Sequence, residues 1–142
     1  MSLDPQVIKD SFELAKPIAK EVSEKFYEIL FQDHPEAREL FASVVMPDQQ
    51  MRLVESLVYI VANVDKPDKL VPYLKNMGSR HTYYNISDEH YGWVGESLLK
   101  TFAFFFKDKW TPQLKQQWTL AYGVIAETMQ AGAQEFKLKK AS

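Results

Sequence analysis

His81 is the side chain in this sequence that is best placed to bind a metal ion. Leu74, Met77 and Gly78 precede it by three to seven residues, so in a helix they would share its face and form an apolar stripe. The ordinary interpretation of such a residue is a half-buried histidine whose ring is satisfied by a local carbonyl. The spacing alone leaves both interpretations open.

Two further polar side chains lie beside apolar helix faces elsewhere in the chain. Gln49 begins a series with a period of four residues that continues with Leu53, Leu57 and Val61, so this face would present one amide followed by aliphatic side chains. Tyr27 lies one position round from a similar stripe in an earlier predicted helix. The nine Phe, seven Tyr and three Trp residues fit either a large aromatic core or a pocket for a flat ligand.

The elements that would position these side chains are all predicted to be helices. Apolar residues recur every three to four positions without any alternating strand pattern, which favours an all-α chain with about seven helices. Four residues are predicted to cap the N-termini of helices: Asp4, Asp48, Ser87 and Thr111. The predicted helices cover about 5–16, 18–31, 35–40, 48–63, 69–81, 87–107 and a last segment from 112 onward, with a turn at 82–86 and a basic, frayed tail from 136.

Length and composition restrict the class of protein. The 142 residues fit a single domain, residues 1–142. The 17 basic and 19 acidic residues are dispersed and give a net charge of −2, so no nucleic acid partner is expected. The absence of cysteine excludes disulfides and thiolate metal sites, and the glycine spacing matches no phosphate-binding loop. No signal peptide or long apolar run is found, so we expect a cytoplasmic protein without a membrane partner.

Three segments give the chain a resemblance to a known family. They are FYEILFQDHPEARELF at 26–41, GSRHTYYNISDEHYGWVGESLL at 78–99 and WTLAYGVIA at 118–126. Their order and spacing resemble those of globins, in particular the bacterial single-domain globins and the globin domain of flavohaemoglobins, over about residues 4–132. The resemblance implies a globin fold around a pocket for haem b.

The same resemblance implies roles for individual residues. His81 resembles the proximal haem-iron ligand, and Tyr27 and Gln49 resemble the distal pair that donates hydrogen bonds to a bound ligand. Phe41 resembles the aromatic wedge against the macrocycle, and Arg80 resembles a partner for a haem propionate. The other implied pocket residues are Leu53, Leu57, Met77, Ile86, Tyr91, Val94 and Leu98. His34 and His90, by contrast, are expected to be solvated.

The expected ligands are dioxygen, nitric oxide and carbon monoxide. Bound dioxygen carries negative charge, so two distal donors are expected to give high oxygen affinity and slow oxygen loss. The first hypothesis is an oxygen-binding protein for storage or delivery. The second is a nitric oxide dioxygenase that takes electrons from a separate reductase, because these 142 residues contain no flavin or nicotinamide domain. A haem-based gas sensor and a haem-free helical interaction module are further alternatives.

One position departs from the flavohaemoglobin pattern. In that group a tyrosine and a glutamate back the proximal histidine and raise its basicity. Tyr91 keeps the tyrosine, but Ala133 stands at the glutamate position, and Glu135 would point elsewhere on a regular helix. We therefore expect the proximal side to resemble that of an oxygen-binding globin rather than that of a peroxidase. We also expect His81 to donate its other N–H to a carbonyl of its own helix.

Overall fold

The computed structural model describes residues 2–81 and 86–141, and this part of the chain forms helices joined by short connections. It contains six α-helices and three short 3₁₀ segments, which confirms the predicted all-α class. The helical segment predicted at 35–40 is one of the 3₁₀ segments. In chain order the elements are α1 (Pro5–Ala15), η1 (Lys16–Ile18), α2 (Ala19–Asp33), η2 (Pro35–Phe41), α3 (Met46–Ala62), α4 (Pro67–His81), α5 (Asp88–Phe106), η4 (Lys107–Lys109) and α6 (Pro112–Ala141).

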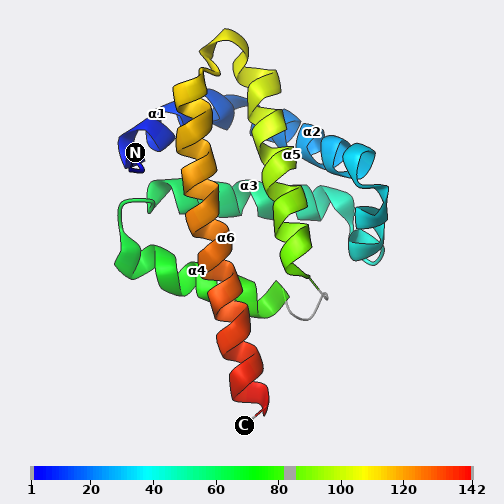
Figure 1. Ribbon diagram of the computed structural model, residues 1–142. Helices are drawn as coiled ribbons and strands as arrows, with labels where there is room; N and C mark the ends of the chain where they lie inside the picture. Colours follow the sequence, from blue (N-terminus) through cyan, green and yellow to red (C-terminus); the bar gives the residue numbers. More distant parts are fainter. Residues whose placement is uncertain (1, 82–85, 142) are drawn as a thin grey trace.

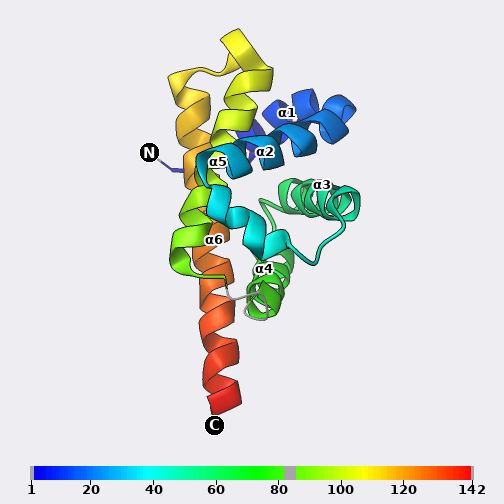
Figure 2. The same cartoon turned by 90° about the vertical axis from the view of Figure 1, so that its right-hand side faces the viewer.

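Figures 1 and 2 show the arrangement of these elements. α5 and α6 run antiparallel to each other as the long axis of the molecule, and α1 to α4 lie on one side of this pair. α3 lies between α2 and α4, and both α3 and α4 cross the direction of α5 and α6. This arrangement places the predicted distal helix α3 and the predicted proximal helix α4 next to each other.

Helix starts follow local chemistry at two of the predicted caps. The Asp4 carboxylate accepts a hydrogen bond from the Gln6 N–H at 3.0 Å, and the Thr111 hydroxyl accepts one from the Leu114 N–H at 3.1 Å. Each bond satisfies a donor that has no partner within the first turn. Proline follows both caps, at a position where its missing N–H costs nothing.

The predicted cap Asp48 is wrong. α3 begins at Met46, with Val45 as the residue before it, and Pro47 lies in the first turn, so Asp48 is already inside the helix. The carboxylate still lies near the positive end of the helix dipole. The cap Ser87 does precede α5, where its N–H donates to Nδ1 of His90 at 3.0 Å.

Two other boundaries differ from the sequence prediction. α4 begins at Pro67, two residues before the predicted start. The frayed tail predicted from residue 136 is wrong, since α6 continues to Ala141. In the turn predicted at 82–86, all residues except Ile86 lie outside those that the structure describes. None of the described helices is both long and apolar enough to cross a membrane.

α4 and α6 are in direct backbone contact at two glycines. A Cβ atom added to Gly78 would overlap the carbonyl oxygen of Met129, and one added to Gly132 would overlap the carbonyl oxygen of Lys75. Backbone atoms cannot move aside as a flexible side chain can, so both positions require glycine. The crossing holds the end of α4, which carries His81, against α6.

The apolar core consists of two clusters of side chains. The first joins α1, α2, α5 and α6 through Phe12, Phe26, Phe102 and Trp118, and Phe102 is fully buried. The indole N–H of Trp118 donates to the buried hydroxyl of Ser11 at 2.9 Å, so this large aromatic side chain leaves no donor unpaired. The second cluster lies between α4, α5 and α6 around Leu74, Tyr91 and Met129.

Candidate functional site

A cavity of about 590 Å³ lies between α3 and α4 and is closed by side chains of α2, η2, α5 and α6. Its volume is in the range of small-molecule and cofactor sites. Most of its lining is apolar. All the pocket residues expected from the sequence line it: Tyr27, Phe41, Gln49, Leu53, Leu57, Met77, Arg80, His81, Ile86, Tyr91, Val94 and Leu98.

His81 is the last residue of α4, and it lines this cavity. Its Nδ1 lies 2.6 Å from the carbonyl oxygen of Met77, one turn earlier, as the sequence led us to expect. A carbonyl can only accept, so Nδ1 carries the proton, and in the neutral ring the lone pair is on Nε2. Burial lowers the pKa of His81, the Met77 hydrogen bond opposes this, and the neighbouring Arg80 charge lowers it further. The ring is therefore neutral near pH 7, the form that binds metals.

Tyr27 and Gln49 meet on the other side of the cavity. The side-chain amide of Gln49 donates to the phenol oxygen of Tyr27 at 3.1 Å. Arg52, one turn further along α3, donates from Nη1 to Oε1 of Gln49 at 3.3 Å. Burial raises the pKa of Tyr27 to about 12, although the Gln49 hydrogen bond and the Arg52 charge act against it. The phenol thus stays protonated and able to donate.

Aromatic rings form the wall beside this pair. The Phe41 ring meets the Tyr27 ring edge-on, with centroids 5.5 Å apart, and meets the Phe31 ring similarly at 5.7 Å. Edge-to-face contacts of this kind fix the ring orientations. Phe41 reaches this position because the 3₁₀ segment η2 turns the chain between Pro35 and α3.

Tyr91 lines the cavity on the α5 side and is nearly fully buried. Its carbonyl oxygen accepts a hydrogen bond from the hydroxyl of Tyr122 on α6 at 2.6 Å. Burial raises the pKa of both phenols. Glu135 points away, as predicted, because its carboxylate pairs with Lys75 on α4 at 2.9 Å. No carboxylate of α6 is hydrogen-bonded to Tyr91 among the residues that the structure describes.

His34 and His90, which were expected to be solvated, are half-buried. The His34 ring stacks on Trp93, with centroids 4.6 Å apart and planes within 10° of parallel, and its Nε2 lies 3.2 Å from the Glu96 carboxylate. His90 and Trp93 both line the cavity. The turn at His34-Pro35 brings the end of α2 back onto α5, a long-range contact that periodicity within one helix does not reveal.

Sequence reasoning also missed Arg52 and Tyr122. Arg52 lies three residues after Gln49, a spacing at which helical side chains are neighbours, so the sequence contained a usable signal. Tyr122 lies in the segment WTLAYGVIA at 118–126, and sequence reasoning assigned it no individual role. Its contact with the backbone of Tyr91 needs the close approach of α5 and α6 at Gly95, where an added Cβ would lie 2.6 Å from the Tyr122 ring.

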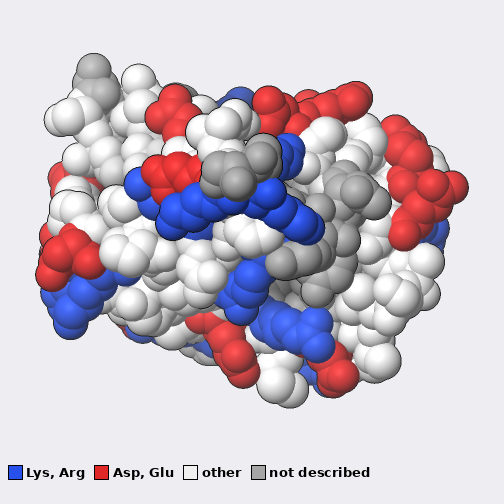
Figure 3. All heavy atoms as spheres, turned by 90° about the horizontal axis from the view of Figure 1, so that it is seen from below, with Lys and Arg blue, Asp and Glu red and all other residues white. Residues whose placement is uncertain are grey.

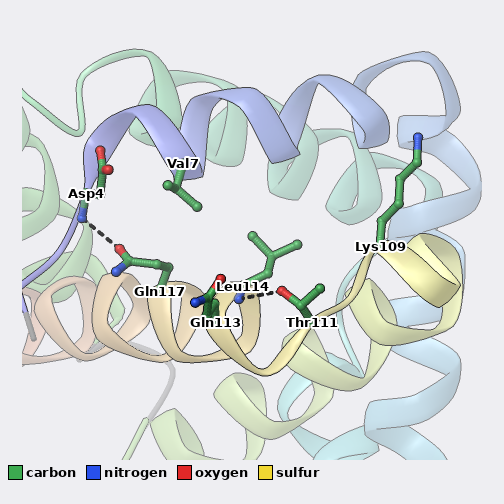
Figure 4. A pocket seen from close by; sticks show the side chains of 7 residues that line it. All are labelled: Asp4, Val7, Lys109, Thr111, Gln113, Leu114 and Gln117. Carbon is green, nitrogen blue, oxygen red and sulfur yellow. Dashed lines mark hydrogen bonds between the residues drawn. The ribbon is translucent and has the colours of Figure 1, made fainter.

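A second hollow, of about 360 Å³, lies far from these residues between the start of α1 and the start of α6 (Figure 4). Here Gln117 ties the N-terminal segment to α6: its Oε1 accepts from the Asp4 N–H at 2.7 Å, and its Nε2 donates to the Ser2 carbonyl at 3.2 Å. Lys109, at the edge of the hollow, points away from its centre. The side-chain amide of Gln117 is hydrogen-bonded to backbone groups. We therefore interpret this hollow as a structural contact between the N-terminal segment and α6.

Charges of both signs share the end of the molecule seen in Figure 3. Basic and acidic side chains are interspersed over this face. This face shows no continuous basic surface of the kind that follows a nucleic acid backbone.

Comparison with known proteins identifies the class of this fold and site. The globin family model matches residues 24–129, and the chain belongs to the globin family. It is 32% identical over 124 residues to a flavohemoprotein of Bacillus subtilis, covering 86% of this chain and 31% of that protein. It is 28% identical over 130 residues to a flavohemoprotein of Rhizobium meliloti, covering 87% and 32%. The chain therefore spans only about a third of the length of these relatives.

Solved structures share the fold over nearly the whole chain. An engineered carbene transferase from Rhodothermus marinus, described as a candidate nitric oxide dioxygenase, superimposes with a TM-score of 0.87 at 22% identity, covering 99% of this chain and 100% of that one. A bacterial globin from Campylobacter jejuni gives a TM-score of 0.82 at 22% identity, covering 94% and 96%. These similarities show the globin fold.

The cavity fits the haem cofactor that the globin and flavohemoprotein relatives imply. A flat macrocycle needs an apolar slot, and its iron needs a neutral imidazole nitrogen. The cavity supplies an apolar lining and the neutral His81 ring, whose Nδ1 proton is committed to Met77. A carbonyl partner for the second ring nitrogen is the usual way to orient a ligating histidine.

Proposed function

We propose that this chain is a single globin domain, residues 1–142, that holds haem b and binds dioxygen reversibly with high affinity, for oxygen binding, storage or delivery. We further propose a cytoplasmic, bacterial protein. When bound, haem supplies the iron that takes up dioxygen, nitric oxide or carbon monoxide. The observation that carries the proposal is the hydrogen bond of Gln49 to Tyr27 on one side of a cavity whose other side holds His81.

In this proposal His81 is the proximal ligand, and Tyr27 and Gln49 are the distal donors. Phe41, Leu53, Leu57, Met77, Ile86, Tyr91, Val94 and Leu98 exclude water from the macrocycle, and Arg80 pairs with a propionate. Because the Tyr27 oxygen accepts from Gln49, its own O–H proton can be donated to a ligand in the cavity. A hydrogen bond to a negatively charged ligand is about twice as strong as one between neutral groups, so it favours dioxygen over carbon monoxide.

Oxygen dissociation measured by stopped-flow tests this role of Tyr27. Tyr27→Phe keeps the ring and removes the donor, so oxygen loss should accelerate roughly 10- to 150-fold, corresponding to about 1.5–3 kcal/mol for a hydrogen bond to a charged group. Carbon monoxide dissociation should change much less. Fast oxygen loss in the unsubstituted protein, unchanged in Tyr27→Phe, contradicts the proposal. A Soret band after haem addition separates it from a haem-free helical module.

A second candidate function is nitric oxide dioxygenase activity supported by a separate reductase. It is favoured by the fold neighbour described as a candidate nitric oxide dioxygenase and by the flavohemoprotein relatives. The reaction combines nitric oxide, dioxygen and one electron to give nitrate, so an electron donor is needed for every turnover. Steady nitrate formation from nitric oxide with a generic reductase supports this activity. A single stoichiometric burst does not distinguish the two roles, because most oxygenated globins react once with nitric oxide. A gas sensor is a third candidate.

A further inference from the structure

The side chains of Arg52, Gln49 and Tyr27 form one chain of hydrogen bonds that runs from the rim of the cavity inward. Arg52 is exposed, Gln49 is half-buried and Tyr27 is buried. The guanidinium donates to the amide oxygen at 3.3 Å, and the amide nitrogen donates to the phenol oxygen at 3.1 Å. Every donor in this chain points toward the cavity interior.

The direction of this chain depends on which way the Gln49 amide is turned. An amide can present either its oxygen or its NH₂ group to a neighbour, and the surrounding hydrogen bonds decide which. With the NH₂ group toward Tyr27, the phenol oxygen accepts and its proton points elsewhere. With the oxygen toward Tyr27, the phenol would donate to Gln49 and its proton would no longer serve a ligand.

Arg52 is the group that distinguishes these two orientations. A guanidinium has five N–H donors and no acceptor, so it can pair only with the amide oxygen. A turned amide would place NH₂ against these donors, which leaves the guanidinium unpaired and adds repulsion between like partial charges. Arg52 and Gln49 are three residues apart on α3, so helix geometry alone keeps them neighbours.

We propose that Arg52 is a positioning residue of the distal pocket, which holds the Gln49 amide with its oxygen outward and so directs the Tyr27 proton into the cavity. This inference rests on the proposed function, since it assumes that Tyr27 donates to a haem ligand. Arg52 is exposed and lies among the residues that line the cavity. Its effect on ligand binding passes entirely through Gln49.

Two measurements on the haem-loaded protein test the inference. The first is the oxygen dissociation rate. The second is the C–O stretching frequency of the ferrous carbon monoxide complex in the infrared, because a proton close to the carbonyl oxygen weakens the C–O bond and lowers this frequency. Arg52→Met keeps an unbranched stem and removes the donors. Lys69→Met, at an exposed position of α4 outside the cavity, loses the same charge and is the matched control.

We expect Arg52→Met to accelerate oxygen loss about 3- to 10-fold and to raise the C–O frequency toward that of Tyr27→Phe. Arg52→Lys, which keeps a donor, should restore most of both properties, and Lys69→Met should change neither. In a Gln49→Leu background, Arg52→Met should have no further effect, because the residue through which it acts is gone. Thermal unfolding of each variant checks that the fold is retained.

Two results overturn the inference alone: Arg52→Met without effect where Tyr27→Phe has one, or an equal effect of Arg52→Met with and without Gln49. The second result would mean that Arg52 acts on the haem or its carboxylates directly. If Tyr27→Phe changes neither the rate nor the frequency, the distal donor of the proposed function fails, and the role of Arg52 fails with it.

Discussion

At the scale of single residues, burial determines the protonation of the groups that face each other across the cavity. Removal from water disfavours the charged form, so it lowers the pKa of the His81 imidazole and raises that of the Tyr27 phenol. Both side chains are therefore neutral near pH 7. One then offers a lone pair and the other a proton, and the proposed haem site depends on both.

The raised pKa of Tyr27 predicts a loss of stability at alkaline pH. The phenol ionises near pH 10 in the unfolded chain and at about 12 in the folded protein. Between these values the unfolded chain has lost a proton that the native state keeps, so the free energy of unfolding falls as pH rises. This residue should contribute a loss of about 1.4 kcal/mol between pH 9 and pH 11.

Urea unfolding of the haem-free protein at both pH values, with and without Tyr27→Phe, measures this contribution. The variant should lose about 1.4 kcal/mol less than the parent over the same interval. Equal losses in the two proteins would show that the phenol does not retain its proton. Tyr59→Phe, which removes a phenol whose side chain is exposed, serves as the control.

At the scale of the helices, the contact between α4 and α6 sets the position of the end of α4 that carries His81. Alanine is normally preferred to glycine inside a helix by about 1 kcal/mol. Gly78 and Gly132 run against this preference because each faces a backbone carbonyl of the other helix. Their effect on stability should therefore have the opposite sign to that of an ordinary helical glycine.

We predict that Gly132→Ala destabilises the protein by about 2 kcal/mol or more, since overpacking against backbone exceeds the gain in helix propensity. Gly123→Ala is a matched control on the same helix, because nothing lies within 4 Å of the added methyl group. It should stabilise by about 0.5–1 kcal/mol. Chemical denaturation of the two variants checks the sign, and equal effects would contradict the backbone contact.

Lys107, the residue directly after α5, has a φ of 53° and a ψ of −120°. It is the only residue other than glycine with a positive φ in the described part of the chain. This conformation costs a side chain of the L form about 1–3 kcal/mol, so Lys107→Gly should stabilise the protein by about 1 kcal/mol net of the entropy of glycine. Lys109→Gly, with the same loss of charge at a negative φ, should destabilise. Thermal unfolding of both variants tests whether the two substitutions have these opposite effects on stability.

The helices could be predicted from the sequence where a boundary depends on a few neighbouring residues. Asp4 and Thr111 cap their helices through bonds that span two or three residues, so local sequence suffices. The end of α6 could not be predicted in this way: no breaker follows Gly132, and that glycine is occupied with the contact to Lys75 rather than with ending the helix. Residues 137–140 at this end of α6 are exposed, so neither a local breaker nor packing marks the end of the helix.

The candidate site was predictable in its lining and less so in its hydrogen bonds. Periodicity places Leu53, Leu57 and Gln49 on one face, and the family resemblance supplies the pairing of that face with His81. The orientation of the Gln49 amide depends on Arg52 and Tyr27 together, which come from two helices. The sequence pattern of one helix does not reveal how far that helix lies from another.

At the scale of the whole molecule, the cavity joins nearly every helix and opens a large apolar space inside a chain of 142 residues. Apolar walls that face no partner lose dispersion contacts. Filling the cavity should therefore stabilise the entire fold rather than one element.

We predict that one equivalent of haem raises the melting temperature of the haem-free protein by about 10 °C or more. A ligand at 1,000 times its dissociation constant contributes about 4 kcal/mol, and each kcal/mol corresponds to roughly 3 °C at this chain length. His81→Ala should lose most of this increment, and added imidazole should restore part of it. Calorimetry of both proteins measures the increment, and an undiminished increment in His81→Ala would contradict the proximal role.

The glycine contacts between α4 and α6 also affect which parts of the molecule can move relative to one another. At Gly78 and Gly132 no side chain separates the two helices, so we expect α4 and α6 to move together at this contact. The end of α4 that carries His81 is part of that pair. In the proposed function, we therefore expect the entry of gas and of haem to depend on displacements of α3 and η2 more than on the α4–α6 pair.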